Sequence, residues 1–216
     1  FRQSENRLLT TVAYRFNGKT SYALEGSIFI AGAAIQWLRD GLELFDNAAN
    51  SEELALSVDD NNDVYFVPAF TGLGAPYWNP EARAMICGLT RESNAAHIVR
   101  AALEAQAYQT YDLMSAMKAD ADVMPAVIRA DGGLVANHFM CQFLADMLDA
   151  DIEIPAVAEC TAWGAACLAG LYAGVFKDLD DVSKSWNADQ RYKPKISSGQ
   201  RASLLKGWEN AISKLL

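Results

Sequence analysis

Hydrophobic and polar positions in the first part of the chain predict a β-hairpin followed by a helix. Residues 8–16 and 19–24 are rich in β-forming side chains, and Asn17-Gly18 lies between them. This dipeptide tolerates the two positive φ angles of a type I′ turn, so the two runs are expected to pair. From Gly26 to Asp40 apolar residues recur at helical spacing. The polar stretch 46–63 predicts a short helix mixed with loop.

The rest of the chain alternates between strand-like and helix-like segments. A long helix is predicted from Asn94, a favourable N-cap residue, to about Ala119. The other expected elements are strands at 64–70, 126–130 and 151–154, and helices directly after Gly133, at 161–173 and in the tail. This order predicts an α/β fold with a mixed sheet that starts with the antiparallel hairpin and carries helices on both faces.

Composition narrows the class of protein and its partners. The 216 residues are 51% hydrophobic and 10% aromatic, which excludes an intrinsically disordered chain. With 27 acidic and 18 basic residues the net charge is −9. Nucleic acid and anionic membranes are therefore not expected as main partners, because both need basic patches. ATP stays compatible with this charge, since a few backbone donors and a metal ion outweigh it locally.

The cysteines, the histidines and the N-terminus point to the cytoplasm. The four cysteines form no CxxC pair and there are two histidines, so no zinc cluster is expected. No apolar run approaches the roughly 18 residues of a membrane span, and the polar first residues do not resemble a signal peptide. We expect a cytoplasmic protein with reduced cysteines. Because the chain starts at Phe1 instead of Met, we expect a piece of a longer chain.

A turn in the second half of the chain is a candidate phosphate site. In residues 128–137 a predicted strand ends in Asp131-Gly132-Gly133 and a helix follows. Gly133 has no Cβ, so a ligand could approach its N–H, and the helix dipole would favour an anion there. The same turn is common in plain α/β crossovers, so these residues alone leave both interpretations open.

A second glycine raises the same question. Gly32 lies inside the predicted helix 26–40, where glycine costs roughly 1 kcal/mol relative to alanine. Close approach of a ligand would explain it, and packing against another helix would explain it equally well. Gln36 follows one turn later, so both residues face the same direction.

Taken together, these segments resemble the C-terminal half of the FGGY family of carbohydrate kinases. The family's second signature is matched by residues 84–89 and, after seven residues, by 97–104, a specific spacing. Three further segments resemble the branch of the family that phosphorylates glycerol, namely 22–26, 31–40 and 67–78. The resemblance extends from residue 4 to about residue 175.

The resemblance implies an actin-like ATPase fold, in which two RNase H-like domains surround a cleft. Residues 1–175 would be the C-terminal nucleotide-binding domain, 176–216 an extension with an amphipathic helix packed on it, and the N-terminal domain would be absent. The family's second domain opens with a three-stranded meander, of which two strands are visible here. The resemblance therefore implies a first strand upstream of Phe1 and an exposed sheet edge without it.

The resemblance also implies a division of the active site. Gly32 and Gln36 match one pair of the family's nucleotide contacts, and Gly133 and Asn137 match the second. Gly133 would offer its backbone N–H to a phosphate and Asn137 its side-chain amide to the nucleotide. Mg²⁺ would offset charge on the phosphates, while the catalytic carboxylate and the glycerol contacts belong to upstream sequence. No catalytic or metal-ligating residue is assigned in this chain.

We therefore expect the ATP- and ADP-binding half of a kinase that converts glycerol to sn-glycerol 3-phosphate, inactive on its own. The first alternative is another FGGY kinase, acting on xylulose or gluconate. The second is a non-catalytic nucleotide-binding protein. Whether the chain forms a homo-oligomer is left open.

Overall fold

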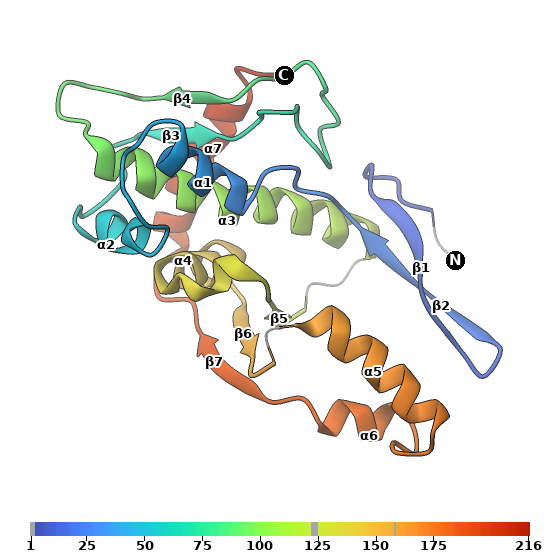
Figure 1. The fold of residues 1–216 in the computed structure, drawn as a ribbon. Coiled ribbons are helices and arrows are strands. Elements are labelled where there is room, and N and C mark those ends of the chain that lie inside the picture. The colour runs from blue at the N-terminus through green and yellow to red at the C-terminus, as the bar shows by residue number, and fades with distance from the viewer. Residues whose placement is uncertain (1–2, 122–124, 158) are drawn as a thin grey trace.

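The computed structural model describes residues 3–121, 125–157 and 159–216. The strands are β1 (Leu9–Phe16), β2 (Lys19–Glu25), β3 (Tyr65–Val67), β4 (Met85–Cys87), β5 (Val127–Arg129), β6 (Asp151–Pro155) and β7 (Ala188–Tyr192). The helices are α1 (Gly32–Asp40), α2 (Asn50–Leu56), α3 (Ala95–Ala121), the 3₁₀ turn η1 (Gly133–Ala136), α4 (His138–Leu148), α5 (Cys160–Tyr172), α6 (Leu179–Lys184) and α7 (Ser198–Ile212) (Figure 1). None of the helices in the described part of the chain is long and apolar enough to cross a membrane.

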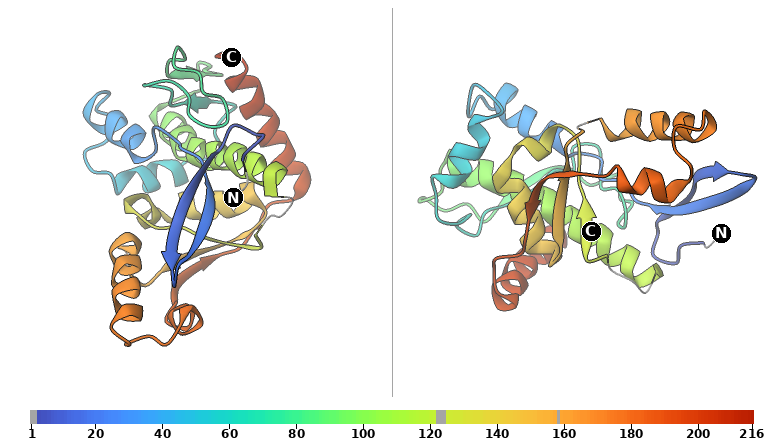
Figure 2. Two further views of the ribbon diagram at one scale, coloured as in Figure 1. Left: turned by 90° about the vertical axis from the view of Figure 1, so that its right-hand side faces the viewer. Right: turned by 90° about the horizontal axis from the view of Figure 1, so that it is seen from below.

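The predicted hairpin is confirmed. Strands β1 and β2 pair antiparallel from Leu9 with Glu25 to Phe16 with Lys19. In the turn between them Asn17 and Gly18 have φ angles of 48° and 76°, the two positive values that a type I′ turn requires. Figures 1 and 2 show the hairpin projecting from the body of the molecule.

The strands of the described residues form three separate sheets. The hairpin is one, β3 and β4 pair antiparallel in a second, and the third has the order β5-β6-β7. The third sheet is mixed, because β5 runs parallel to β6 and β7 runs antiparallel to it. The structure differs from the prediction in that the hairpin is not hydrogen-bonded to the mixed sheet. Among the described strands, none pairs with the outer edge of β1 or of β5.

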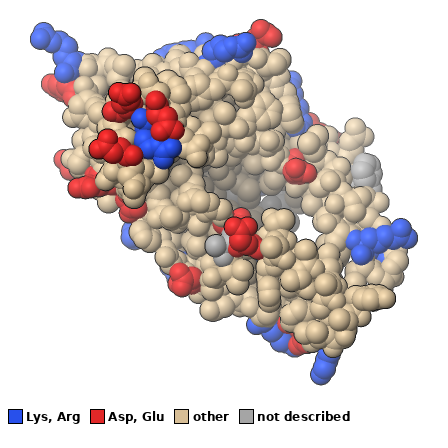
Figure 3. All heavy atoms as spheres, viewed as in Figure 1, with Lys and Arg blue, Asp and Glu red and all other residues tan. Residues whose placement is uncertain are grey.

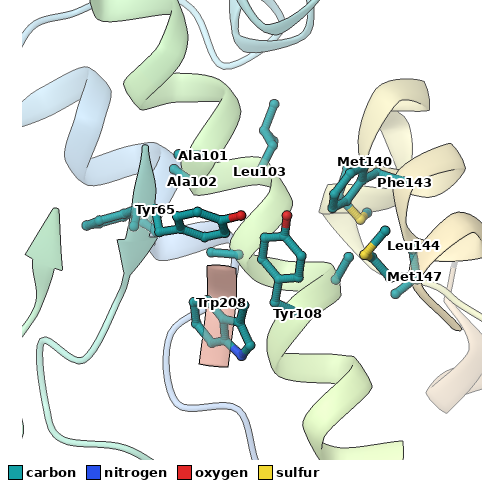
Figure 4. Close-up of a cluster of buried hydrophobic side chains, with 14 of the residues drawn as sticks. Tyr65, Ala101, Ala102, Leu103, Tyr108, Met140, Phe143, Leu144, Met147 and Trp208 are labelled. Atoms are coloured by element: carbon teal, nitrogen blue, oxygen red, sulfur yellow. The ribbon is translucent and has the colours of Figure 1, made fainter. Parts of the chain in front are cut away.

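The core lies around α3, which packs against α1, α2, α4 and β3. The ring of Tyr108 stacks on Trp208 of α7 with 5.3 Å between centroids, and meets the edge of Phe143 of α4 at 5.5 Å. Figure 4 shows these rings converging from the three helices. Asn94 begins α3 as predicted, because its Oδ1 accepts hydrogen bonds from the backbone N–H groups of Ala96 and His97. The tail helix α7 thus belongs to the same core.

Helix α1 begins at Gly32, so the prediction of a helix from Gly26 is wrong. A Cβ on Gly26 would lie 1.9 Å from Cδ1 of Leu113, which shows that the backbone passes close against α3 here. The next carbonyl, that of Ser27, accepts a hydrogen bond from the N–H of Ala75 at 3.2 Å. These tertiary contacts hold residues 26–31 outside the helix, although their apolar spacing resembles one.

The helix predicted directly after Gly133 is also displaced. Residues 133–136 form the turn η1, and α4 starts only at His138. Between them Asn137 has an extended backbone, with φ −89° and ψ 107°, and its Oδ1 accepts a hydrogen bond from the N–H of Met140 at 2.8 Å. An N-cap residue leaves the helical conformation in this way, so Asn137 separates the glycine turn from the α-helix.

Candidate functional site

The four residues singled out in the sequence line one cavity of about 680 Å³. Its walls come from the start of α1, from residues 48–52 around the start of α2, and from the turn η1 with its flanks. The lining residues are Ala31, Gly32, Ala33, Ile35, Gln36, Ala48, Ala49, Ser51, Glu52, Asp131, Gly132, Gly133, Leu134, Ala136 and Asn137. The fold therefore brings together two predicted pairs that lie far apart in the chain.

Gly32 is the first residue of α1 and not an interior helix residue. An ideal Cβ built on it meets no heavy atom within 4 Å, so packing against another helix does not explain this glycine. Its N-cap, Ala31, makes no side-chain capping hydrogen bond, and the first N–H groups of a helix lack intrahelical acceptors. Gln36 follows one turn later with an exposed side chain. The start of α1 thus offers backbone donors and open space to the cavity.

The glycine turn has the same openness. Neither Gly132 nor Gly133 would place a Cβ within 4 Å of another atom, and Gly132 has a φ of +94°, a backbone conformation that favours glycine. Asp131 beside the turn raises the pKa of the Cys160 thiol at the start of α5, first through a hydrogen bond. An anion of the size of a phosphate can therefore approach this turn without displacing a side chain.

Asn137 also caps the start of α4, a role that the sequence motif does not indicate. It is 9% exposed, and its Oδ1 is engaged in capping α4. Its Nδ2 donates to Oγ of Ser51 at 3.4 Å, and the Ser51 hydroxyl in turn donates to the carbonyl of Ala48 at 2.6 Å. Since a side-chain amide carries two N–H donors, one remains for a ligand while the other joins α4 to α2.

Glu52 is the cavity residue that sequence reasoning missed. Its Oε2 accepts a hydrogen bond from the N–H of His138 at 3.0 Å, so a carboxylate of α2 caps the start of α4 beside Asn137. Burial raises the pKa of the Cys141 thiol to about 11, and the charge of Glu52 adds to this rise. The stretch 46–63 gave no signal for this role, because Glu52 and His138 are 86 residues apart.

The charged side chains that line the described cavity are both acidic. They are Glu52 and Asp131, and no lysine or arginine occurs among the described lining residues. Figure 3, in the same view as Figure 1, shows a hollow on the viewed face with acidic atoms at its rim. An anionic ligand here would be bound by backbone dipoles and not by cationic side chains.

A larger cavity of about 920 Å³ lies beside α2, α4 and α7 and contains two residues of the matched signature. Arg100 Nε donates to Glu104 Oε1 at 2.9 Å, and its Nη1 donates to the carbonyls of Ala55 and Val58. Burial raises the pKa of Glu104, although Arg100 and Asn61 oppose the shift. This network joins the end of α2 to α3, so these two residues of the signature stabilise the helix that forms one wall of the 680 Å³ cavity.

A model of the C-terminal domain of the FGGY family of carbohydrate kinases matches residues 3–173. The chain belongs to this family. The match confirms the resemblance read from the sequence, and the cavity of this FGGY domain contains every residue for which that resemblance implied a nucleotide contact.

Relatives and solved structures of the FGGY family agree with this membership. The glycerol kinase of Nitrosomonas eutropha is 59% identical over the whole chain. A crystal structure of Plasmodium falciparum glycerol kinase with ADP covers the whole chain with a TM-score of 0.92 and 36% identity. A xylulose kinase from Rhodospirillum rubrum also covers it, with a TM-score of 0.83 and 23% identity. The chain spans 43% of the length of each. The predicted α/β, actin-like ATPase fold class is confirmed.

Proposed function

We propose that this chain is the nucleotide-binding part of an ATP-dependent glycerol kinase that forms sn-glycerol 3-phosphate in the cytoplasm. In this proposal residues 1–175 are the nucleotide-binding domain and 176–216 an extension on the same core. The observation that carries the proposal is the single cavity shared by Gly32, Gln36, Gly133 and Asn137. The likeness to a glycerol kinase solved with ADP supports it over the whole chain.

In this proposal the glycines of the cavity bind the phosphates, and the two amide side chains bind the nucleoside. The open start of α1 at Gly32 and the turn at Gly133 offer backbone N–H groups to phosphate oxygens, and the dipole of α1 favours negative charge there. Gln36 and Asn137 offer side-chain amides to the nucleoside. Rigid backbone donors of this kind stabilise charge on the phosphates without rearranging during the reaction.

Mg²⁺ enters this proposal with the nucleotide. No group of three or more His, Cys, Asp or Glu side chains suited to a metal ion exists among the described residues. In kinases Mg²⁺ is held by one or two carboxylates together with substrate phosphates and water. When bound, Mg²⁺ offsets charge on the transferring phosphoryl group. The catalytic base and the glycerol contacts are expected in the part of the relatives that this chain does not span.

Nothing observed favours xylulose or gluconate over glycerol. The xylulose kinase likeness, at 23% identity, shows the fold alone, whereas the glycerol kinase relative is 59% identical. The decisive experiment joins this chain to the preceding part of the N. eutropha enzyme and measures phosphate transfer from ATP to glycerol, xylulose and gluconate. We expect strong preference for glycerol, and no transfer by the 216-residue chain alone.

The relative's own complete enzyme serves as the control for that experiment. A folded joined protein that prefers a sugar would move the proposal to a sister branch of the family. A folded joined protein that binds ADP but transfers phosphate to none of the three acceptors would support the non-catalytic alternative.

A single substitution tests the site itself. Gly133→Val adds a side chain where no atom lies within 4 Å, so the fold has room for it while the phosphate approach is crowded. We expect ADP affinity to fall about tenfold or more, as for the loss of a hydrogen bond to a charged group. Gly164→Val, at an equally open glycine of α5 outside the cavity, is the matched control. Unchanged ADP affinity in folded Gly133→Val would remove the site assignment.

A further inference from the structure

The cavity has two chemically different ends. At one end are the start of α1, which has no side-chain cap, and the Gly132–Gly133 turn, where a Cβ on either glycine would meet no atom within 4 Å. At the other end are α2 and the start of α4, where Asn137 and Glu52 already occupy the first N–H groups of the helix. Figure 1 shows the start of α1 and η1 toward the hairpin and α5, with α2 on the opposite side. We call these the glycine end and the amide end.

The two predicted pairs have the same order along the chain. Gly133 and Asn137 are separated by the four-residue turn η1, about 8 Å at 2.0 Å per residue. Gly32 and Gln36 are separated by one turn of α1, about 6 Å at 1.5 Å per residue. In both pairs the glycine precedes the amide. Each end carries one carboxylate, Asp131 beside the glycine turn and Glu52 on α2, so charge repulsion does not set the direction. The backbone donors at the start of α1 attract phosphates, so a nucleotide places its phosphates at the glycine end and its base at the amide end.

Resting on the proposed function, we infer that Glu52 selects the base: its carboxylate accepts a hydrogen bond from the exocyclic amino group of adenine and disfavours a purine with a carbonyl at that position. The cavity wall at the amide end consists of Ala48, Ala49, Ser51 and Glu52. The alanines offer a flat apolar contact to a ring, and Glu52 is the wall's charged acceptor. Each carboxylate oxygen can accept two hydrogen bonds, so the bond from His138 to Oε2 leaves acceptor capacity for the base.

The carbonyl of hypoxanthine is an acceptor where adenine has a donor. Against Glu52 it would lose a charge-assisted hydrogen bond and leave two acceptors facing each other. A site built to receive a donor rejects the analogue that lacks it. We therefore expect the chain to bind ADP about tenfold to a hundredfold more tightly than IDP.

The test is the ratio of the IDP and ADP dissociation constants, measured by calorimetry with the 216-residue chain in the presence of Mg²⁺. In Glu52→Gln the amide oxygen can still accept from His138, so the α4 cap is retained while the amide N–H₂ can face the base as a donor. We expect the ratio to fall about tenfold. Glu53→Gln is the matched control, because Glu53 is the next residue of α2, is exposed and does not line this cavity. Its ratio should equal that of the parent.

The possible outcomes separate this inference from the proposed function. A parent chain that binds ADP and IDP equally, or a Glu52→Gln variant that weakens both nucleotides alike, would leave Glu52 with its capping role and overturn the inference, while the proposed function stands. A parent chain that binds neither nucleotide would reject the proposed function and this inference together.

Discussion

The core around α3 buries its large apolar side chains, whereas the hairpin and α5 expose side chains of the same kind. Around α3 the large side chains are buried, with Tyr108 1% and Trp208 2% exposed. In the hairpin (residues 9–25) and in residues 160–175, which we call the outer arm, they face outward: Val12 is 56%, Tyr172 96% and Val175 72% exposed. Helix α5 has one buried residue, Cys167, among its thirteen. Local sequence is enough to form an element, but burial requires a partner for each face.

The comparison shows that the outer arm, unlike the core, leaves large apolar side chains exposed to solvent. The core closes on itself within the described residues, whereas the arm leaves apolar side chains exposed, and no described strand pairs with the outer edge of β1. Exposed sheet edges and large apolar patches mark surfaces that other chains or domains cover. The mutations below are expected to affect the two regions in different ways.

The largest expected effect is in the core. Trp208→Ala removes a ring stacked on Tyr108 and the Nε1 donor that meets Oδ2 of Asp112 at 2.7 Å. We expect unfolding in urea to show a loss of about 3–5 kcal/mol. Tyr172→Ala in the arm should change the free energy of unfolding by less than about 0.5 kcal/mol. Equal losses at the two positions would end the contrast between the regions.

A smaller core effect depends on pH. Burial raises the pKa of Asp112 to about 6, against the opposing hydrogen bonds from Trp208 and Tyr77. Because this native pKa exceeds the ordinary value of 3.8, the stabilising contribution of the protonated group is full below pH 4 and is lost as the pH rises through 6.

Asp112→Asn removes this dependence. The variant should match the parent near pH 4 and exceed its free energy of unfolding by about 1–3 kcal/mol at pH 7. Urea unfolding of both proteins at pH 4, 5, 6 and 7 measures the difference. A difference that stays constant over this interval would show that Asp112 has an ordinary pKa.

The smallest effect on stability, and the clearest on association, is expected in the arm. The double variant Val12→Thr, Tyr172→Ser should keep the free energy of unfolding within about 0.5 kcal/mol. It should lower the self-association of the chain in sedimentation equilibrium, because both side chains belong to exposed apolar surface. Leu56→Ser, at a leucine 63% exposed outside the arm, is the control. If Leu56→Ser reduces association as much, the arm has no special part in it.

Features governed by neighbours in the chain were predictable from sequence. The hairpin follows from Asn17-Gly18, whose conformational freedom is a property of the dipeptide itself. The start of α3 follows from Asn94, which caps residues two and three positions on. Local pattern singled out Gly133 and the pair Gly32 and Gln36, whereas Asn137 and the assignment of all four to a nucleotide came from the family resemblance and stay a prediction.

Features governed by distant contacts were not predictable. The start of α1 depends on Gly26 passing against Leu113, a contact that no local pattern announces. The part of Glu52 depends on the N–H of His138, which only the fold brings near. The hairpin was predicted to join the mixed sheet, but it forms a sheet of its own. Which strands pair with each other depends on the fold as a whole and cannot be predicted from the hairpin sequence.

The length of α3 has a consequence for exchange with solvent. Its 27 residues span about 40 Å at 1.5 Å per residue, from the buried Val99 to a last turn in which Lys118 and Ala119 are exposed. Amides near Val99 are reached by deuterium only when the whole core unfolds, whereas those of the last turns are reached through local opening. One continuous helix should therefore show slow exchange at one end and fast exchange at the other.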